Sequence, residues 1–284
     1  MAKILVIGGG AMGSAFTIPC LDNKNNVTIT EPYSKQFINN LKSKNKFHSV
    51  LKIKLPKKLK FRIFSKELLK EKFNLIVIAL SLPGINFISK ELKNIKNKTP
   101  ILILTKGLKY DKKRNKILTI SEQIKIDTKN KNISVLKGPC LAKELAKKNQ
   151  TKVIIANKNI NIAKKIGKLI STNYYLVEYS TDIIGVEVCS AIKNIYAMVI
   201  GAGQSLNMSS SLFQKSLLEM KYLTKYFNGK ETTVESLAGV GDLYVSAAGG
   251  RNSKMGDYLG KGFTFKSAKK KFMYKDTVEG EQLV

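Results

Sequence analysis

The 284-residue sequence has almost no histidine and little cysteine. The single histidine, His48, stands in the polar stretch KNKFHSV, where we expect a surface loop. Histidine is the usual acid/base group near neutral pH. Because the one histidine of this chain is expected in a surface loop, we do not expect a histidine-dependent catalytic mechanism. The cysteines are odd in number and form no CxxC pair, which argues against a disulfide framework and against a zinc site; they are Cys20, Cys140 and Cys189. We therefore expect reduced thiols and no metal.

Arginine is also scarce. The chain has 50 basic and 20 acidic side chains, a formal net charge of +30, yet its arginines are only Arg62, Arg114 and Arg251. Nucleic-acid binding uses clustered basic groups, and arginine is preferred for bidentate phosphate contacts. The lysines are instead spread over residues 1–180 among many asparagines. We therefore expect no nucleic-acid partner, although the net charge should attract small anions.

Long apolar runs are missing from the sequence. No run reaches the roughly 18 residues that a membrane helix needs. The start, MAKILVIGGG, is typical of a strand that enters a glycine turn rather than of a signal peptide. We therefore expect a cytoplasmic protein with no integral membrane segment. A chain of this length with 43% hydrophobic residues can form two domains.

The first part of the chain alternates short β-rich runs with helical patterns. The expected strands are Lys3–Ile7, Val27–Thr30, Leu75–Leu80, Ile101–Leu104, Ser134–Leu136 and Val153–Ala156. Such alternation predicts a parallel sheet covered by helices. From about Asp182 the pattern is mainly helical, with glycine loops expected near 239–241 and 249–250. We therefore predict a first domain over residues 1–180 and a helical substrate and catalytic domain over 181–284.

A glycine motif follows the first expected strand. In KILVIGGGAMGSAF, Gly8, Gly10 and Gly13 have the spacing G-x-G-x-x-G, and a helix follows. The first glycine permits a tight turn, the second lets a pyrophosphate approach the backbone, and the third allows helix and strand to pack closely. The helix N-terminus, at Ala11 and Met12, supplies donors to the anion. The motif predicts a Rossmann-like, doubly wound α/β domain that binds a dinucleotide; an ordinary glycine turn is the alternative.

The second expected strand ends in front of Glu31, 18 positions after Gly13. A carboxylate there accepts hydrogen bonds from the ribose hydroxyls of NAD and repels a 2′-phosphate. The position favours NAD over NADP. The alternative is a solvated carboxylate with Lys35 contacting the 2′-phosphate of NADP.

A cation interrupts the apolar segment EVCSAIKNIYAMV at residues 187–199. At helical spacing its apolar positions share one face, which we expect to pack against the domain; they are Val188, Ile192, Ile195 and Val199. Lys193 lies on another face, with mostly small neighbours that leave room for a ligand. It is either a lysine that reaches water or, without a catalytic histidine, the natural proton donor.

Seven motifs occur in an order that resembles the NAD(P)-dependent glycerol-3-phosphate dehydrogenase family. They are GGGAMG, TKG (105–107), GPCLAKELA (138–146), AIKN (191–194), LAGVGDL (237–243), GGRN (249–252) and VEG (278–280). The resemblance spans nearly the whole chain. It implies reversible hydride transfer between NAD(P)H and dihydroxyacetone phosphate to give sn-glycerol 3-phosphate, which feeds glycerophospholipid synthesis. It implies a phosphorylated small-molecule substrate and no metal, and it leaves a homodimer open.

The resemblance also implies roles for individual residues. Lys193 matches the catalytic lysine, and Asp242 the carboxylate that orients it, although a turn carboxylate is an alternative for Asp242. The substrate-binding positions are Lys106, Gly138, Cys140, Asn194, Ser246, Arg251 and Asn252. The cofactor-binding positions are Gly8, Gly10, Ala11, Met12, Gly13, Glu31, Lys106, Ala142, Arg251 and Glu279. A surface lysine is the alternative for Lys106.

Two of the chain's departures from the family pattern bear most on its function. Cys140 stands where bacterial members usually have serine, and a thiol is a weaker donor. The chain ends soon after VEG, where relatives continue through several helices, so it is either compact or incomplete. Two other functions therefore stay open. One is a lysine-dependent β-hydroxyacid dehydrogenase, although EVCSAIK lacks the glycine-rich stretch typical of those enzymes. The other is an inactive cofactor-binding module.

Overall fold

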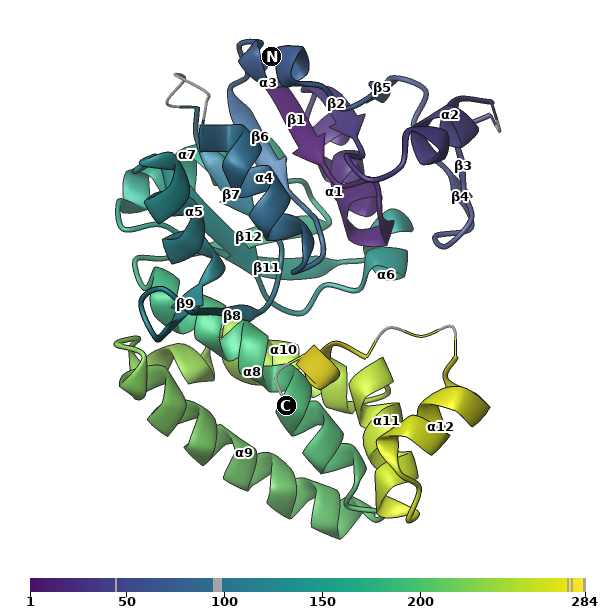
Figure 1. Ribbon diagram of the computed structural model, residues 1–284, viewed down its shortest axis with the longest axis vertical. Coiled ribbons are helices and arrows are strands. Elements are labelled where there is room, and N and C mark those ends of the chain that lie inside the picture. The colour runs from purple at the N-terminus through teal and green to yellow at the C-terminus, as the bar shows by residue number, and fades with distance from the viewer. Residues whose placement is uncertain (44, 94–98, 275, 277, 283–284) are drawn as a thin grey trace. The chain divides into compact units, whose positions relative to one another are not determined.

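The computed structural model describes residues 1–43, 45–93, 99–274, 276 and 278–282, the side chains of residues 279 and 282 excepted (Figure 1). The chain forms two compact units. The first comprises Met1–Leu136 and Cys140–Ile183, and the second comprises Lys137–Pro139 and Ile184–Val284. Each unit is described on its own.

An eight-stranded sheet is the centre of the first unit, in the order β12-β11-β10-β7-β6-β1-β2-β5 (Figure 1). The pairs β1–β2, β1–β6, β6–β7, β7–β10, β11–β12 and β2–β5 are parallel. The strand bounds are β1 Lys3–Ile7, β2 Asn26–Thr30, β5 Lys60–Phe61, β6 Leu75–Ile78, β7 Ile101–Ile103, β10 Ile133–Lys137, β11 Thr151–Ala156 and β12 Tyr175–Ser180.

Helices pack against this sheet because successive strand side chains point to opposite faces. Ile4 and Val6 of β1 join one apolar cluster with Phe16 of α1, and the equally buried Leu5 and Ile7 point the other way. Helix α1 packs with α6 and α7, and α4 packs with α5. The helix bounds are α1 Ala11–Asp22, α2 Lys35–Ser43, α3 Lys66–Lys70, α4 Gly84–Lys93, α5 Ile120–Thr128, α6 Ala142–Ala146 and α7 Ile160–Ile170.

The predicted fold class is confirmed, and each expected strand overlaps a strand of the sheet. Strands β5 and β12 were not predicted, nor were two hairpins: β3 (Phe47–His48) with β4 (Ile53–Lys54), and β8 (Leu108–Asp111) with β9 (Lys116–Thr119). Several of these strands have only two residues, so they carry little periodicity.

The expectation that His48 lies in a surface loop was wrong. His48 belongs to β3, and only 1% of the residue is exposed. Burial lowers the pKa of its imidazole, against the opposing effect of a hydrogen bond at Gly9. The lysines and asparagine near His48 in the sequence indicated an exposed loop, whereas contacts with distant residues bury it.

The second unit is helical. Its elements are α8 Ile183–Gly201, α9 Leu206–Tyr226, the 3-10 helix Glu231–Glu235, the π-helix Leu237–Gly241, α10 Asp242–Ala247, α11 Arg251–Gly260, α12 Phe265–Phe272 and the 3-10 helix Glu279–Gln282. Helices α8 and α9 run antiparallel (Figure 1). The Ser209 hydroxyl donates to the Ile200 carbonyl at one end of the pair, and Cys189 lies 3.4 Å from Thr224 at the other.

Helix α8 is buried on more than the one face that its apolar spacing predicted. Ile192 is buried as expected, but Val199 is 41% exposed, whereas Lys193 and Asn194 are buried. The helix is also long and apolar enough to cross a membrane, contrary to the expectation that no segment reaches this length. Because 72% of its apolar window is buried within the protein, it has the properties of a core helix.

Helices α8 and α11 approach to backbone contact through Gly256. A Cβ atom there would lie 1.9 Å from the Met198 carbonyl oxygen. We expect Gly256→Ala to lower the free energy of unfolding by about 1–3 kcal/mol or more, because the backbones must separate. Denaturant unfolding measures this. The exposed Lys254→Ala in the same helix is the control, expected to change stability by less than about 0.5 kcal/mol. Equal stability of the two variants would contradict the contact.

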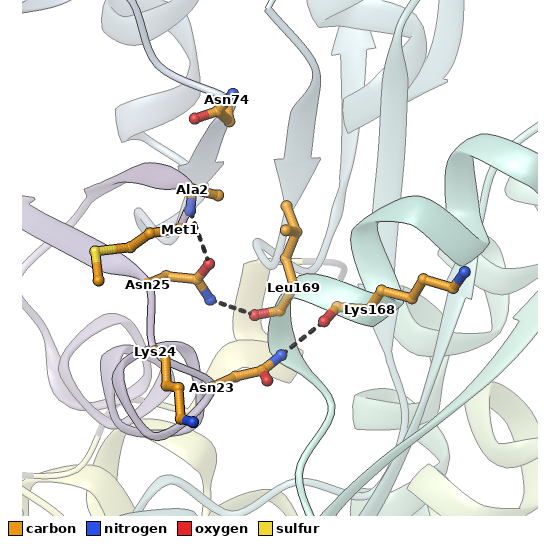
Figure 2. Close-up of a pocket in the computed structure, with 8 residues that line it drawn as sticks. All are labelled: Met1, Ala2, Asn23, Lys24, Asn25, Asn74, Lys168 and Leu169. Atoms are coloured by element: carbon orange, nitrogen blue, oxygen red, sulfur yellow. Dashed lines mark hydrogen bonds between the residues drawn. The ribbon is translucent and has the colours of Figure 1, made fainter.

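A hollow of about 560 Å³ lies beside the amino end of β1. Figure 2 shows that its asparagines bind backbone around it: Asn23 and Asn25 donate their amides to the Lys168 and Leu169 carbonyls, each at 2.6 Å. Those carbonyls belong to the last turn of α7, which has no intrahelical donors for them. The asparagines therefore hold α7 in place. Ligands of parallel sheets bind at the opposite, carboxyl ends of the strands.

Candidate active site

The carboxyl ends of three neighbouring strands lie level in the first unit. Ile7, the last residue of β1, is in register with Thr30 of β2 and with Ile78 of β6. The chain proceeds from β1 to β2 on one side and later returns to β6 on the other, so the strand order reverses at β1. This is the switch point at which open α/β sheets bind their ligands. The glycine turn follows β1 at this position.

The glycines of this turn differ in the space around them. Gly8 has a φ of +119°, and a Cβ there would lie 2.4 Å from the Ala79 carbonyl oxygen. A Cβ at Gly13 would lie 2.0 Å from the Gly8 carbonyl oxygen, so helix and turn touch. Gly10 is exposed, and no described atom lies within 4 Å of a Cβ built on it. The turn is therefore closely packed everywhere except at the glycine where a ligand would approach.

The turn leads into the N-terminus of α1. Gly10 is the N-cap residue, and no described side chain caps the helix. Ala11 and Met12 form the start of the first turn and are half-buried. The first N–H groups of a helix have no intrahelical acceptor and favour an anion. The pyrophosphate of a dinucleotide fits this open, donor-rich turn.

Glu31 follows β2 and binds the same turn. Its Oε2 accepts the Gly9 N–H at 2.8 Å, and its Oε1 accepts the Tyr33 N–H at 3.0 Å. These bonds fix the carboxylate beside the glycine turn. Lys35, the alternative residue for a 2′-phosphate, is exposed at the start of α2.

The other predicted residues of the first unit lie near strand ends. Lys106 is half-buried after β7, where the preceding Thr105 hydroxyl donates to the Leu80 carbonyl at 2.7 Å. Cys140 is a thiol outside any disulfide, and both Cys140 and Ala142 pack half-buried against the apolar core. Burial is the main reason that the pKa of Tyr175 is raised, and the thiol of Cys140 raises it further.

The second unit brings Lys193 and Asp242 together. The Lys193 Nζ lies 2.6 Å from the Asp242 Oδ1, and their side chains are only 8% and 2% exposed. Lys193 also donates to the Ser246 Oγ at 2.5 Å. The lysine and the aspartate are 49 positions apart in the sequence. A buried pair of this kind is costly to desolvate and contributes little net stability, so its presence favours a functional role.

Further contacts hold the aspartate, and one of them was missed by sequence reasoning. The Ser190 hydroxyl, fully buried one turn before Lys193, donates to the Asp242 Oδ2 at 3.2 Å. The Ser246 hydroxyl donates to the Asp242 carbonyl oxygen at 2.8 Å. Asp242 follows the π-helix Leu237–Gly241, so the loop expected near 239–241 was wrong. The only signal for Ser190 was its position three residues before Lys193.

Two asparagines join three segments of the second unit. The Asn252 amide donates to the Asn194 Oδ1 at 3.1 Å, and its own Oδ1 accepts the Gly280 N–H at 3.0 Å. The AIKN, GGRN and VEG motifs therefore meet here. Arg251 is exposed at the start of α11. The side chain of Glu279 lies outside the described residues.

Gly138 lies in the second unit with a φ of +118°. The neighbouring Pro139, in the same unit, lies 3.6 Å from a Cβ built at Gly241, so this proline meets the LAGVGDL motif. Over the described stretches 1–43, 45–93, 99–274, 276 and 278–282, no group of three His, Cys, Asp or Glu side chains could hold a metal ion.

Comparison with known proteins agrees with this geometry. Residues 3–163 match the family described as NAD-dependent glycerol-3-phosphate dehydrogenase N-terminus, and residues 182–284 match the corresponding C-terminus family. The NADP(+)-dependent glycerol-3-phosphate dehydrogenase of Archaeoglobus fulgidus is 31% identical, covering 93% of this chain and 82% of its own. Glycerol-3-phosphate dehydrogenase [NAD(P)+] of Clostridium botulinum is 30% identical over 94% and 82% of the two chains.

A solved structure leads to the same assignment. Glycerol-3-phosphate dehydrogenase from Coxiella burnetii has a TM-score of 0.86 and 26% identity, covering 99% of this chain and 86% of the other. Both halves of the chain match the family in sequence, and the fold matches one of its solved structures. The chain belongs to the NAD-dependent glycerol-3-phosphate dehydrogenase family.

Proposed function

We propose that the chain reversibly reduces dihydroxyacetone phosphate to sn-glycerol 3-phosphate with NAD(P)H, supplying glycerophospholipid synthesis. The observation that carries this proposal is the buried pair of Lys193 and Asp242 in a member of this family. A bound nicotinamide would supply the hydride. The first unit would hold the dinucleotide at the turn of Gly8, Gly10 and Gly13, and the second would supply the proton donor.

Lys193 carries the proton chemistry in this proposal. Hydride arrival converts the substrate carbonyl into an alkoxide, and an ammonium positioned at that oxygen stabilises the charge and donates a proton. Asp242 and Ser246 hold the Nζ atom by hydrogen bonds of 2.6 and 2.5 Å. Ser190 holds the second oxygen of the aspartate, so it is a positioning residue. In the reverse direction Lys193 accepts the hydroxyl proton.

Arg251 suits the substrate phosphate because its guanidinium is planar, always charged and exposed at a helix start. The resemblance supports substrate contacts for Lys106, Gly138, Cys140, Asn194, Ser246 and Asn252. Asn194 and Asn252 bind each other, so one bond between them must be shared with or replaced by substrate. Ala11, Met12, Ala142 and Glu279 are proposed cofactor contacts on the same basis.

Glu31 favours NAD over NADP, because a fixed carboxylate accepts ribose hydroxyls and repels a 2′-phosphate. The Archaeoglobus relative is named NADP-dependent, so the alternative with Lys35 has support of its own. We expect Glu31→Ser to weaken NADH binding by roughly 10- to 150-fold, as for the loss of a charge-assisted bond of about 1.5–3 kcal/mol, and to improve NADPH binding. Fluorescence titration with both cofactors measures this. Lys35→Ala should leave NADH binding unchanged. If this variant instead loses NADPH binding selectively, Lys35 contacts the 2′-phosphate and NADP is the preferred cofactor.

The test of the proposed reaction is the oxidation of NADH and of NADPH with dihydroxyacetone phosphate as the acceptor. Turnover with that acceptor but not with β-hydroxyacid or 3-keto acid substrates supports the proposal. NADH binding without turnover of any substrate would favour an inactive cofactor-binding module. A cytoplasmic location, a homodimer and the absence of a nucleic-acid partner or metal are part of the same proposal; native mass measurement tests the dimer.

A further inference from the structure

Side chains contact the N–H, the carbonyl oxygen and the Cα of Gly9, the glycine between the two motif positions Gly8 and Gly10. Glu31 accepts its N–H at 2.8 Å. Its carbonyl oxygen accepts the Ser14 hydroxyl at 2.8 Å and lies 3.3 Å from the His48 Nε2. A Cβ built on Gly9 would lie 2.6 Å from the Phe37 ring, so a side chain there would force Phe37 to move.

The contacts of His48 define which ring nitrogen carries the proton. The Leu51 N–H donates to Nδ1 at 3.2 Å, so Nδ1 is the acceptor and must be unprotonated. Nε2 therefore carries the hydrogen and donates it to the Gly9 carbonyl. Phe37 packs edge-on against the imidazole, with ring centroids 5.9 Å apart, which holds the ring plane. No element of the proposed chemistry uses this buried group.

The bond to the Gly9 carbonyl controls the neighbouring peptide. The Gly9 carbonyl and the Gly10 N–H belong to one planar trans peptide and point in opposite directions. Holding the oxygen against His48 and Ser14 therefore turns the Gly10 N–H away from them. Gly10 is the one glycine of the turn with open space in front of it. Glu31 is bound to the N–H of the preceding peptide, so the carboxylate depends on the same arrangement.

We propose that His48 is a positioning residue for cofactor binding: its Nε2–H fixes the Gly9–Gly10 peptide so that the turn and Glu31 are preset for the dinucleotide. This inference rests on the proposed function, in which the turn binds NAD(P)H. The support of the glycine turn then comes from the β3–β4 hairpin, which lies outside the glycine motif.

Two amide variants separate the bonds of His48. In His48→Asn the side-chain oxygen can still accept the Leu51 N–H, but the amide is too short to reach Gly9. In His48→Gln the longer amide can reach the Gly9 carbonyl. We expect His48→Asn to raise the Kd of NADH about 3- to 10-fold, as for one lost hydrogen bond, with kcat at saturating NADH unchanged. We expect His48→Gln to bind NADH within about twofold of wild type.

The measurements are NADH titration by fluorescence, kcat with saturating NADH, and the unfolding midpoint without cofactor. A wild-type Kd in His48→Asn overturns the proposal. It is also overturned if both variants lose the same affinity in parallel with a lower unfolding midpoint, since that indicates a structural role alone. If wild-type protein binds no NADH, the proposed function itself fails.

A second readout needs no cofactor. Because the chain has one histidine, its ring nitrogen resonances are assigned without ambiguity. We expect the neutral Nε2–H tautomer at pH 7. A predominant Nδ1–H tautomer would overturn the bond to Gly9.

Discussion

Lys193→Ala is expected to lower kcat by about 10³-fold or more, because positioned proton donation is worth roughly 10²–10⁴-fold and alkoxide stabilisation roughly 10²–10³-fold. The affinity for NADH should stay within a few-fold of wild type, since the glycine turn belongs to the other unit of the chain. Steady-state assay with dihydroxyacetone phosphate and fluorescence titration of NADH measure the two quantities separately.

The variant needs a control for stability, because it leaves Asp242 buried without its cation. Removing one partner of a buried pair costs about 3–5 kcal/mol. Lys193→Ala combined with Asp242→Asn removes the unpaired charge, so the double variant should regain stability without regaining turnover. Lys221→Ala is the matched lysine control, since it breaks only the exposed 2.7 Å pair with Glu235 on the surface of the same unit.

The outcome that would contradict the assignment is turnover above a tenth of the wild-type rate in folded Lys193→Ala. Another group would then have to donate the proton. If Lys193→Ala does not fold, a folded but inactive double variant would support the assignment as fully as an inactive single variant would.

The second large effect is expected at Gly10. Gly10→Ala should weaken NADH binding by roughly 5- to 150-fold, as for about 1–3 kcal/mol of steric conflict, while the unfolding midpoint of the free protein stays unchanged. The reason is that its Cβ would contact no described atom of the protein and would occupy the space in which the pyrophosphate approaches.

Gly13→Ala is the comparison variant for this prediction. Its Cβ would lie 2.0 Å from the Gly8 carbonyl oxygen, so it should lower the unfolding midpoint even without cofactor. Calorimetry of the free protein and titration with NADH distinguish the two variants. Normal NADH binding by Gly10→Ala would show that the dinucleotide does not approach this turn.

Several features were predictable because they depend on neighbouring residues in the chain. The Gly8, Gly10 and Gly13 spacing and the apolar run before it define a strand, a turn and a helix within 22 residues. The alternation of β-rich runs with helical runs predicts a parallel sheet for the same reason. Lys193 could be singled out because the chain lacks a histidine suited to catalysis.

Tertiary structure alone decided the remainder. His48 has polar neighbours in sequence, and only the packing of β3 against the glycine turn and Phe37 buries it. Val199 belongs to the apolar spacing of α8 yet is exposed, whereas Lys193 and Asn194 are buried. Spacing within the helix does not specify which of its sides the rest of the protein covers.

The sequence thus determined the parallel sheet, the glycine turn and the identity of the lysine, because local propensity and residue spacing encode them. The family resemblance had already paired Asp242 with Lys193, but local propensity and spacing do not, and the contacts themselves were decided by folding. Asp242 and Ser246 lie 49 and 53 positions away from it, and no local pattern specifies which distant carboxylate or hydroxyl a buried ammonium will meet. Helix packing brings them within 2.6 Å, since a buried charge must find its hydrogen-bond partners inside the protein.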